Sequence, residues 1–227
     1  MDGTLLTALA LIPALVIAIV FHEVAHGWTA LALGDPTAKE RKRLSFNPIR
    51  HVDPIGTLLL PGMLALSGLP VFGWAKPVPV IKQRLRNPRF GMMAVAAAGP
   101  GMNFALALIG AVALGLLARG GVQPEGLTGF AIASLYSFIL INIFLALFNL
   151  LPIPPFDGSH VVEGLLPPRA AQVYDKLRPF GFPLLFLLLL VIPYFFPGLG
   201  IVERVVLPPV RWAEAWYLGL ASLIAGG

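Results

Sequence analysis

The sequence predicts an all-α protein that crosses a membrane several times. Of its 227 residues, 57% are hydrophobic and only 12% are charged, whereas about a quarter of the residues in a typical soluble domain are charged. Five charge-free runs each approach or exceed the roughly 20 residues that a helix needs to cross hydrocarbon. They are residues 3–21, 54–75, 90–118, 126–156 and 180–202.

These runs and their connections fill nearly the whole chain, so we expect one membrane-embedded domain over residues 1–227 with about four to six membrane segments. Its core covers about residues 5–165, and an extra span and an interfacial tail follow over about 180–227. The absence of cysteine excludes disulfides, thiol nucleophiles and cysteine-ligated zinc. The net charge of +5 indicates orientation in a lipid bilayer, not a nucleic-acid partner. The oligomeric state is left open.

The first apolar run is expected to be a retained span over about residues 5–33. A signal peptide has a basic start and a small-residue cleavage site. This run instead begins beside Asp2 and leads into the polar residues His22 and Glu23 of the same helix. Gly34, followed by an Asp-Pro dipeptide, supplies a C-cap and a stop for this helix.

Two connecting segments, residues 39–50 and 76–89, hold most of the positive charge, and the positive-inside rule places both in the cytoplasm. The run between them, residues 54–75, would then be a re-entrant hairpin, with its break at Pro61 and Gly62. The alternative is a single span with one basic loop outside. The basic residues are Lys39, Arg41, Lys42, Arg43, Arg50, Lys76, Lys82, Arg84, Arg86 and Arg89.

The second half of the chain predicts an antiparallel helix pair and a further span. Residues 90–118 are rich in Ala and Gly, which lets helices approach closely in lipid, and a turn-like stretch leads into 126–156. Residues 163–178 carry both charge signs and indicate an interfacial segment on the cytoplasmic side. A span over about 182–196 follows. The tail from residue 201 is either an interfacial helix or a last span, and both interpretations stay open.

The strongest chemical signal is the sequence His22-Glu23-Val-Ala-His26, an H-E-x-x-H motif. The i, i+4 spacing places both imidazoles on one helix face, where they can share a metal ion. Ionisable groups inside a membrane helix cost roughly 2.5–3.5 kcal/mol each and are normally kept for function. Two other interpretations are histidines bonded to carbonyls with Glu23 as counter-charge, and a proton or ion path.

A catalytic zinc site takes three protein ligands and keeps one position open. The third ligand must therefore come from outside the motif. Asp157 differs from the other candidates because it follows a long charge-free run that three prolines interrupt, and broken helices at membrane depth line polar cavities. The candidates are His51, His160, Asp35, Asp53 and Asp157.

With these residues the chain resembles the site-2 protease family of intramembrane zinc metalloproteases over about residues 5–165. Besides the H-E-x-x-H motif, the resemblance rests on a Gly-Pro-x-x-Asn sequence at Gly99 to Asn103 and on Asn149, Pro152 and Asp157-Gly158. The chain lacks the PDZ or CBS domains of many relatives, so it resembles the compact branch. The resemblance implies a helical core with a re-entrant segment. It also implies one zinc ion bound by His22, His26 and Asp157, water activation by Glu23, and Asn149 at the scissile carbonyl.

The resemblance implies regulated cleavage of membrane-protein substrates in or near their transmembrane segments, in the cell membrane. Zinc lowers the pKa of water to about 7, so that Glu23 could take a proton and return it to the leaving amine. Asn149 is a plausible donor to the developing oxyanion, or else makes an interhelical hydrogen bond. For Asn103 and Asn142 we expect such interhelical bonds. A metal or proton transporter and a catalytically silent scaffold remain as alternatives.

The metal hypothesis constrains the topology. If residues 34–50 are cytoplasmic, His22 and His26 lie roughly 10–17 Å from the end of their helix. Asp157 reaches that depth only if residues 54–75 are re-entrant, which places the active site toward the cytoplasmic side. Residues 72–80 alternate and are proline-rich, so they predict either an edge strand that pairs with an unwound substrate or an interfacial tryptophan anchor.

Overall fold

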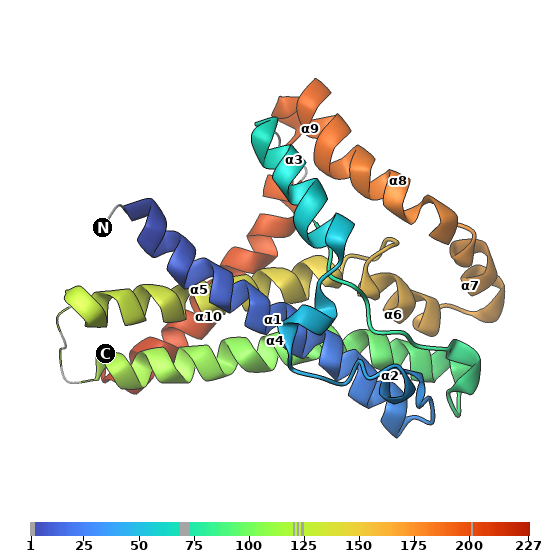
Figure 1. The fold of residues 1–227 in the computed structure, drawn as a ribbon, viewed down its shortest axis with the longest axis horizontal. Helices are drawn as coiled ribbons and strands as arrows, with labels where there is room; N and C mark the ends of the chain where they lie inside the picture. The colour runs from blue at the N-terminus through green and yellow to red at the C-terminus, as the bar shows by residue number, and fades with distance from the viewer. Residues whose placement is uncertain (1–2, 69–72, 120, 122, 124, 201) are drawn as a thin grey trace.

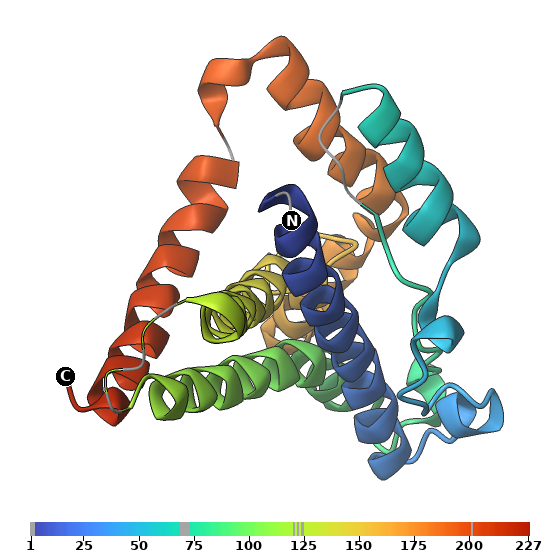
Figure 2. The ribbon, with the colours of Figure 1, turned by 60° about the vertical axis from the view of Figure 1, so that its left-hand side comes forward.

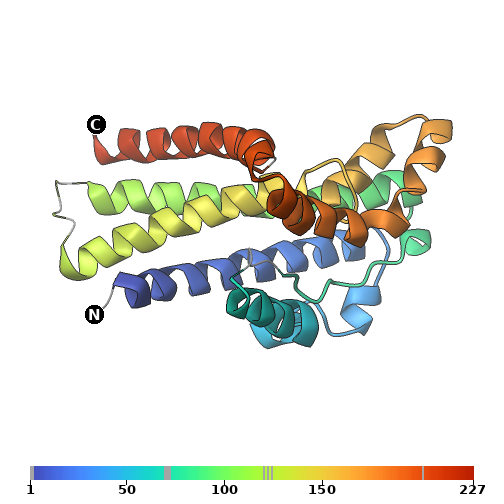
Figure 3. The same cartoon turned by 90° about the horizontal axis from the view of Figure 1, so that it is seen from above.

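Four long helices run alongside one another and form the body of the protein. They are α1 (Gly3–Ala32), α4 (Pro88–Ala118), α5 (Gly126–Asn149) and α10 (Leu207–Ala225). In the computed structural model, which describes residues 3–68, 73–119, 121, 123, 125–200 and 202–227, the start of α1 and the end of α10 lie at the same end of this bundle (Figures 1 and 3). The polar connections and α6 (Asp157–Leu165) gather at the other end.

The remaining elements are short helices and single turns. The short α-helices are α2 (Thr37–Glu40), α3 (Leu60–Leu66), α7 (Pro168–Asp175), α8 (Gly181–Phe186) and α9 (Ile192–Phe195). The 3-10 turns cover Pro48–His51, Lys82–Arg84, Arg178–Phe180 and Pro197–Leu199, and π-helical turns cover Pro54–Leu59, Leu187–Val191 and Val202–Val206. The described residues contain no β-strand.

Four segments are long and apolar enough to cross a membrane, which confirms the predicted all-α, multi-pass class. They are Leu9–Ala32, Pro88–Ala118, Gly126–Asn149 and Pro168–Phe195. The last combines α7, α8 and α9, and it starts earlier than the span predicted over about 182–196 because the predicted interfacial segment is itself largely helical. Little of its surface is covered by the rest of the chain.

The ends of the long helices follow from local sequence. Gly34 adopts a φ of +108°, a left-handed conformation that glycine tolerates, and it stops α1 where the sequence predicts. At the start of α4, the side chain of Asn87 accepts a hydrogen bond from the Phe90 amide at 3.1 Å, and Pro88 occupies the first helical turn.

The largest apolar core lies between α4, α5 and α10, and it shows where the tail packs. Small residues allow close packing: a Cβ on Gly115 of α4 would lie 2.6 Å from the Ala221 carbonyl of α10. The tail therefore forms a helix that packs on α4 and α5, and whether it crosses the membrane or lies at its interface stays open. The buried members of this core are Ala107, Ala111, Ile139, Ile143, Val206, Val210, Ala213, Tyr217 and Ala221.

The described residues on either side of 69–72 start and end at the same place beside the bundle, an arrangement compatible with the predicted re-entrant segment. The backbone N–H of Trp74 donates to the Gly56 carbonyl at 3.0 Å, so the two ends of the excursion meet (Figure 2). The predicted break at Pro61 and Gly62 is wrong, since α3 runs through both residues. The π-helical turn of Pro54–Leu59 leads directly into α3, and the Gly56 carbonyl, five residues before Pro61, accepts from the Trp74 N–H instead, so the missing N–H of Pro61 leaves no carbonyl there unpaired.

An extended segment, residues 73–81, connects this excursion to the start of α4, and we call it the strap. The backbone N–H of Lys76 donates to the His51 carbonyl at 2.8 Å. The N–H of Ile81 donates to the Asp35 carboxylate at 2.6 Å. The strap is extended as the sequence predicts but has no partner strand in the described chain. Pairing with a substrate therefore stays a prediction.

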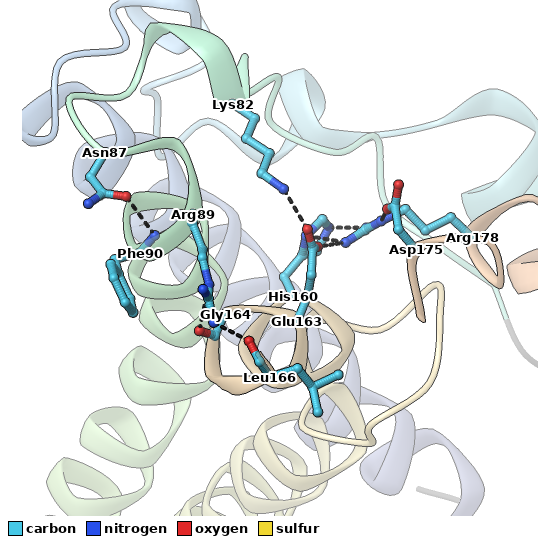
Figure 4. Close-up of polar contacts among 10 residues, drawn as sticks. All are labelled: Lys82, Asn87, Arg89, Phe90, His160, Glu163, Gly164, Leu166, Asp175 and Arg178. Carbon is cyan, nitrogen blue, oxygen red and sulfur yellow. Dashed lines mark hydrogen bonds and ion pairs between the residues drawn. The ribbon is translucent and has the colours of Figure 1, made fainter. Parts of the chain in front are cut away.

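Helix α6 is held in place by charged residues from three other parts of the chain. Lys82, just after the strap, contacts Glu163 of α6 at 2.6 Å, and Arg178 contacts the same carboxylate (Figure 4). Arg89 of α4 donates to the carbonyls of Gly164 and Leu166 at the end of α6 (Figure 4). Burial alone would raise the pKa of Glu163, but Lys82 and Arg178 outweigh it and lower that pKa below its usual value.

We predict that Glu163→Gln lowers the free energy of unfolding at pH 7 by about 1–2 kcal/mol, because two charge-assisted hydrogen bonds are weakened. Thermal unfolding in detergent measures this. Glu125→Gln, which changes an exposed carboxylate, is the control and stays within about 0.5 kcal/mol.

The destabilisation by Glu163→Gln depends on pH in a defined direction. Because the pKa of Glu163 is lower in the folded than in the unfolded chain, its stabilisation is complete above the unfolded value of about 4.3. It is lost as the pH falls through the folded value. A difference between the two proteins that does not shrink on acidification contradicts this assignment.

Candidate metal centre

Helix α1 brings two imidazole rings together on one of its faces. His22 and His26 are one helical turn apart and both buried, and their Nε2 atoms lie 3.0 Å from each other. The unbroken helix over this stretch fixes the direction of both side chains. The i, i+4 spacing of the motif therefore produces the shared face that the sequence predicts.

Asp157 joins this pair from the far side of the chain. Its Oδ2 lies 3.1 Å from Nε2 of His22 and 3.3 Å from Nε2 of His26. Helix α5 ends at Asn149, and the proline-rich residues 150–156 turn the chain so that α6 begins at Asp157. A Cβ on Gly158 would lie 2.2 Å from the Leu150 carbonyl, so this turn requires glycine.

The outer nitrogen of each ring fixes the tautomer. Nδ1 of His22 lies 2.6 Å from Oδ1 of Asn103, and Nδ1 of His26 lies 2.6 Å from the Val95 carbonyl oxygen. Both partners only accept hydrogen bonds, so each Nδ1 carries the proton. In the neutral ring the lone pair of Nε2 then faces the centre of the group, as a metal ligand requires.

Asn103 connects three helices around the site. Its Nδ2 donates to Oδ1 of Asn142 on α5 at 2.8 Å and to the Ala18 carbonyl on α1 at 3.1 Å, which turns Oδ1 toward His22. The predicted interhelical hydrogen bond of Asn103 and Asn142 is confirmed. The contact with His22 was missed, although a lone amide in a long apolar helix was a usable signal.

The spacing of the three ligand atoms fits a tetrahedral metal ion. Zinc bonds of about 2.0–2.1 Å put the ligand atoms of a tetrahedron about 3.3 Å apart. The atoms of His22, His26 and Asp157 are separated by 3.0–3.3 Å. Two neutral imidazoles and one carboxylate are typical of a catalytic zinc site, and three ligands leave a fourth position open.

Glu23 lies on α1 between the two histidines but outside this ligand group. Its Oε2 accepts a hydrogen bond from the backbone N–H of Val78 in the strap at 2.7 Å. Within the described chain, Oε1 has no hydrogen-bond partner, so one carboxylate oxygen is left to accept a proton. The strap thus supplies a contact that the sequence did not predict.

The other candidate ligands are engaged elsewhere. Nε2 of His51 contacts the Ser45 carbonyl at 2.7 Å, and the carboxylate of Asp53 caps the helical turn that begins at Pro54. Asp35 accepts from the strap. Burial and the guanidinium of Arg178 lower the pKa of His160 to about 4, and its ring contacts Arg178 instead of the metal group.

Asn149 is not joined to the ligand group by a hydrogen bond. Its Nδ2 donates to the Leu145 carbonyl at 2.9 Å, one turn earlier in α5. An amide nitrogen carries two N–H groups, so one donor remains for another acceptor. Its role at the scissile carbonyl therefore stays a prediction.

Comparisons with known proteins agree with one another. The sequence profile described as peptidase family M50 matches residues 10–192. "Putative zinc metalloprotease YwhC" of Bacillus subtilis strain 168 is 39% identical over 198 residues, which cover 85% of this chain and 87% of that protein.

More distant relatives carry a similar name. "Putative zinc metalloprotease Rip2" of Mycolicibacterium smegmatis is 30% identical over 173 residues, 76% of this chain and 62% of that protein. The protein of the same name from Mycobacterium tuberculosis H37Rv is 30% identical over 175 residues, 77% of this chain and 63% of that protein. No solved structure gives a significant match. Among the activities that the sequence left open, these matches favour a zinc-dependent peptidase over a transporter or a scaffold.

The packing of α4 on the histidine pair generates a prediction. A Cβ on Gly99 would lie 2.5 Å from Cε1 and Nε2 of His26 and 2.6 Å from Cε1 of His22. Gly99→Ala must therefore displace the rings, and we expect zinc affinity to fall about 10- to 100-fold. Competition with a chromophoric chelator measures this.

Gly101→Ala is the matched control, because Gly101 lies on the same helix and a Cβ there meets nothing within 4 Å. It should bind zinc as the wild type does. Unchanged zinc affinity in Gly99→Ala would show that the close approach of α4 does not set the ring positions.

Proposed function

Since the chain belongs to peptidase family M50 and is a membrane zinc metalloprotease, we propose that the histidine pair of α1 and Asp157 hold its zinc ion and that Glu23 is the general base. One observation carries this proposal: three ligand atoms from helices far apart in sequence lie 3.0–3.3 Å apart, with the imidazole lone pairs turned inward.

Charge compensation supports the assignment. The charge of a divalent cation is balanced by the two carboxylates of Asp157 and Glu23, so the group as a whole is formally neutral. It can therefore persist at low dielectric without a large unpaired charge. Each carboxylate also has a polar partner: Glu23 accepts from the Val78 N–H, and Asp157 contacts the imidazole of His22. The site thus compensates its own charge within the bundle.

Each group of the site then has its own role in peptide hydrolysis. Zinc in such a site polarises a carbonyl and lowers the pKa of water to about 7. The carboxylate of Glu23 takes the proton of the attacking water and later returns it to the leaving amine nitrogen. The hydrogen bond from Val78 orients that carboxylate during both transfers.

Asn149 is assigned to the substrate carbonyl. It ends α5 just before the turn that leads to Asp157, so it is close in sequence to a ligand. The N–H of its Nδ2 that Leu145 does not use can donate to the oxygen on which negative charge develops.

The substrates are membrane proteins that are cut in or near a transmembrane segment, in regulated intramembrane proteolysis. His22, Glu23 and His26 all lie inside a segment long enough to cross the membrane, which supports reacting groups at membrane depth. Helical peptide bonds are shielded by their own hydrogen bonds, so a substrate must unwind there, and Gly or Pro in its span favours this.

The active site faces the cytoplasmic end of the bundle. The two basic segments, residues 39–50 and 76–89, meet at this end: Arg84 pairs with Glu40 at 2.9 Å, and Arg43 donates to the Lys76 carbonyl at 2.6 Å. The positive-inside rule places such a surface in the cytoplasm. All of residues 1–227, α8 to α10 included, form one membrane-embedded protease domain.

Glu23→Gln tests the assigned base. We expect cleavage of a reporter with a membrane helix to fall at least 100-fold, as loss of a general base does, while zinc content stays at one ion per chain. Asp157→Ala is the complementary variant and should lose zinc as well as activity. Equal cleavage by Glu23→Gln and wild type, or full zinc in Asp157→Ala, would overturn the respective role.

Asn149→Ala tests the assigned donor. We expect kcat to fall about 10- to 100-fold with KM within about twofold, because the lost contact forms mainly in the transition state. Zinc content should not change. Steady-state cleavage of the reporter measures both constants. An unchanged kcat would show that Asn149 has no role at the substrate carbonyl.

A further inference from the structure

The strap presents a single backbone donor to Glu23. Val78 lies between Pro77 and Pro79, and proline has no backbone N–H. The N–H of Val78 is therefore the one donor of this tripeptide, and it lies 2.7 Å from Oε2 of Glu23. A shift of the strap by an ångström or two would break this bond, so its position along α1 matters.

Arg43 fixes the strap directly before Val78. Its Nη2 donates to the carbonyl of Lys76 at 2.6 Å and is 3.4 Å from that of Pro77. Arg43 is only 8% exposed, and its Nε is buried without a hydrogen-bond partner. Burying an arginine with an unmet donor costs free energy, so this placement needs a compensating role.

A second buried charge fixes the other side of Val78. Asp35 is fully buried and accepts the N–H of Ile81 at 2.6 Å. Hydrogen bonds within its own turn, from Thr37, hold the same carboxylate. Arg43 thus binds strap carbonyls before Val78 and Asp35 binds a strap amide after it.

We infer that Arg43 is a positioning residue for peptide hydrolysis: it holds the Lys76 and Pro77 carbonyls so that the Val78 N–H orients the carboxylate of Glu23. The inference rests on the proposed role of Glu23 as general base. Arg43 makes no hydrogen bond or ion pair with the three ligands or with Glu23 among the described contacts, although its charge lies near enough to Glu23 for a Coulombic interaction. One guanidinium nitrogen, Nη2, contacts both carbonyls, so the ammonium group of a lysine at this position could replace part of the contact.

The test compares Arg43→Met and Arg43→Lys with Arg50→Met in detergent-purified protein. Arg50 lies in the same basic segment and donates to the Lys42 carbonyl at 2.8 Å, but it is exposed and does not contact the strap. Three quantities are measured for each protein: zinc content, kcat and KM on the reporter, and hydrogen exchange of the peptide that contains Val78, Val80 and Ile81.

In Arg43→Met we expect kcat to fall about tenfold, KM to stay within about twofold and zinc content to equal that of the wild type. Amide exchange in the strap should rise about tenfold, because its hydrogen bonds open more often. Arg43→Lys should recover at least a third of the wild-type kcat. Arg50→Met should match the wild type in all three measurements.

Unchanged strap exchange in Arg43→Met overturns the inference, whatever happens to activity. So does faster exchange with an unchanged kcat, provided that Glu23→Gln is inactive. Loss of zinc in Arg43→Met also overturns it, since the residue would then support the metal group itself. Because exchange is measured without substrate, it distinguishes failure of this inference from failure of the role assigned to Glu23, which Glu23→Gln tests alone.

Discussion

Two imidazoles and a carboxylate can stay within about 3.3 Å of one another in an apolar bundle only if their outward-facing polar atoms also find partners. The structure meets this constraint with one amide side chain and one backbone carbonyl. Asn103 receives the proton of His22, and the carbonyl of Val95 receives that of His26. Both partners belong to α4, which explains why α4 approaches α1 so closely that only Gly99 fits between them.

The site combines a rigid half with a half that is tied down by long-range contacts. The histidines lie on α1, whose position α4 and α5 fix through Asn103 and Asn142. Asp157 begins the short helix α6, and the strap is an extended segment without a partner strand in the described chain. Glu163 supplies an anchor for α6, and Arg43 supplies one for the strap. Charged groups at the polar end of the bundle thereby set the geometry of groups at membrane depth.

The sequence was sufficient wherever a local rule determines the outcome. Residue spacing predicted the shared face of His22 and His26, and the proline-interrupted run singled out Asp157. Packing decided the rest. Pro61 does not end the helix because the Gly56 carbonyl is paired with Trp74. The charged tail packs on the bundle because small residues of α4 leave room for it. The contact of Val78 with Glu23 depends on a strap that lies 55 residues away from it in sequence, which no local pattern encodes.

The separation of the proposed ligands along the chain determines when the proposed metal site is complete. His22 and Asp157 are 135 residues apart, and α4 and α5 lie between them. Synthesis delivers the histidines early and the aspartate late, so a nascent chain has an incomplete ion-binding site until three long helices have been inserted and packed. On the proposed assignment, the capacity to cut peptides therefore arises only after these helices have packed.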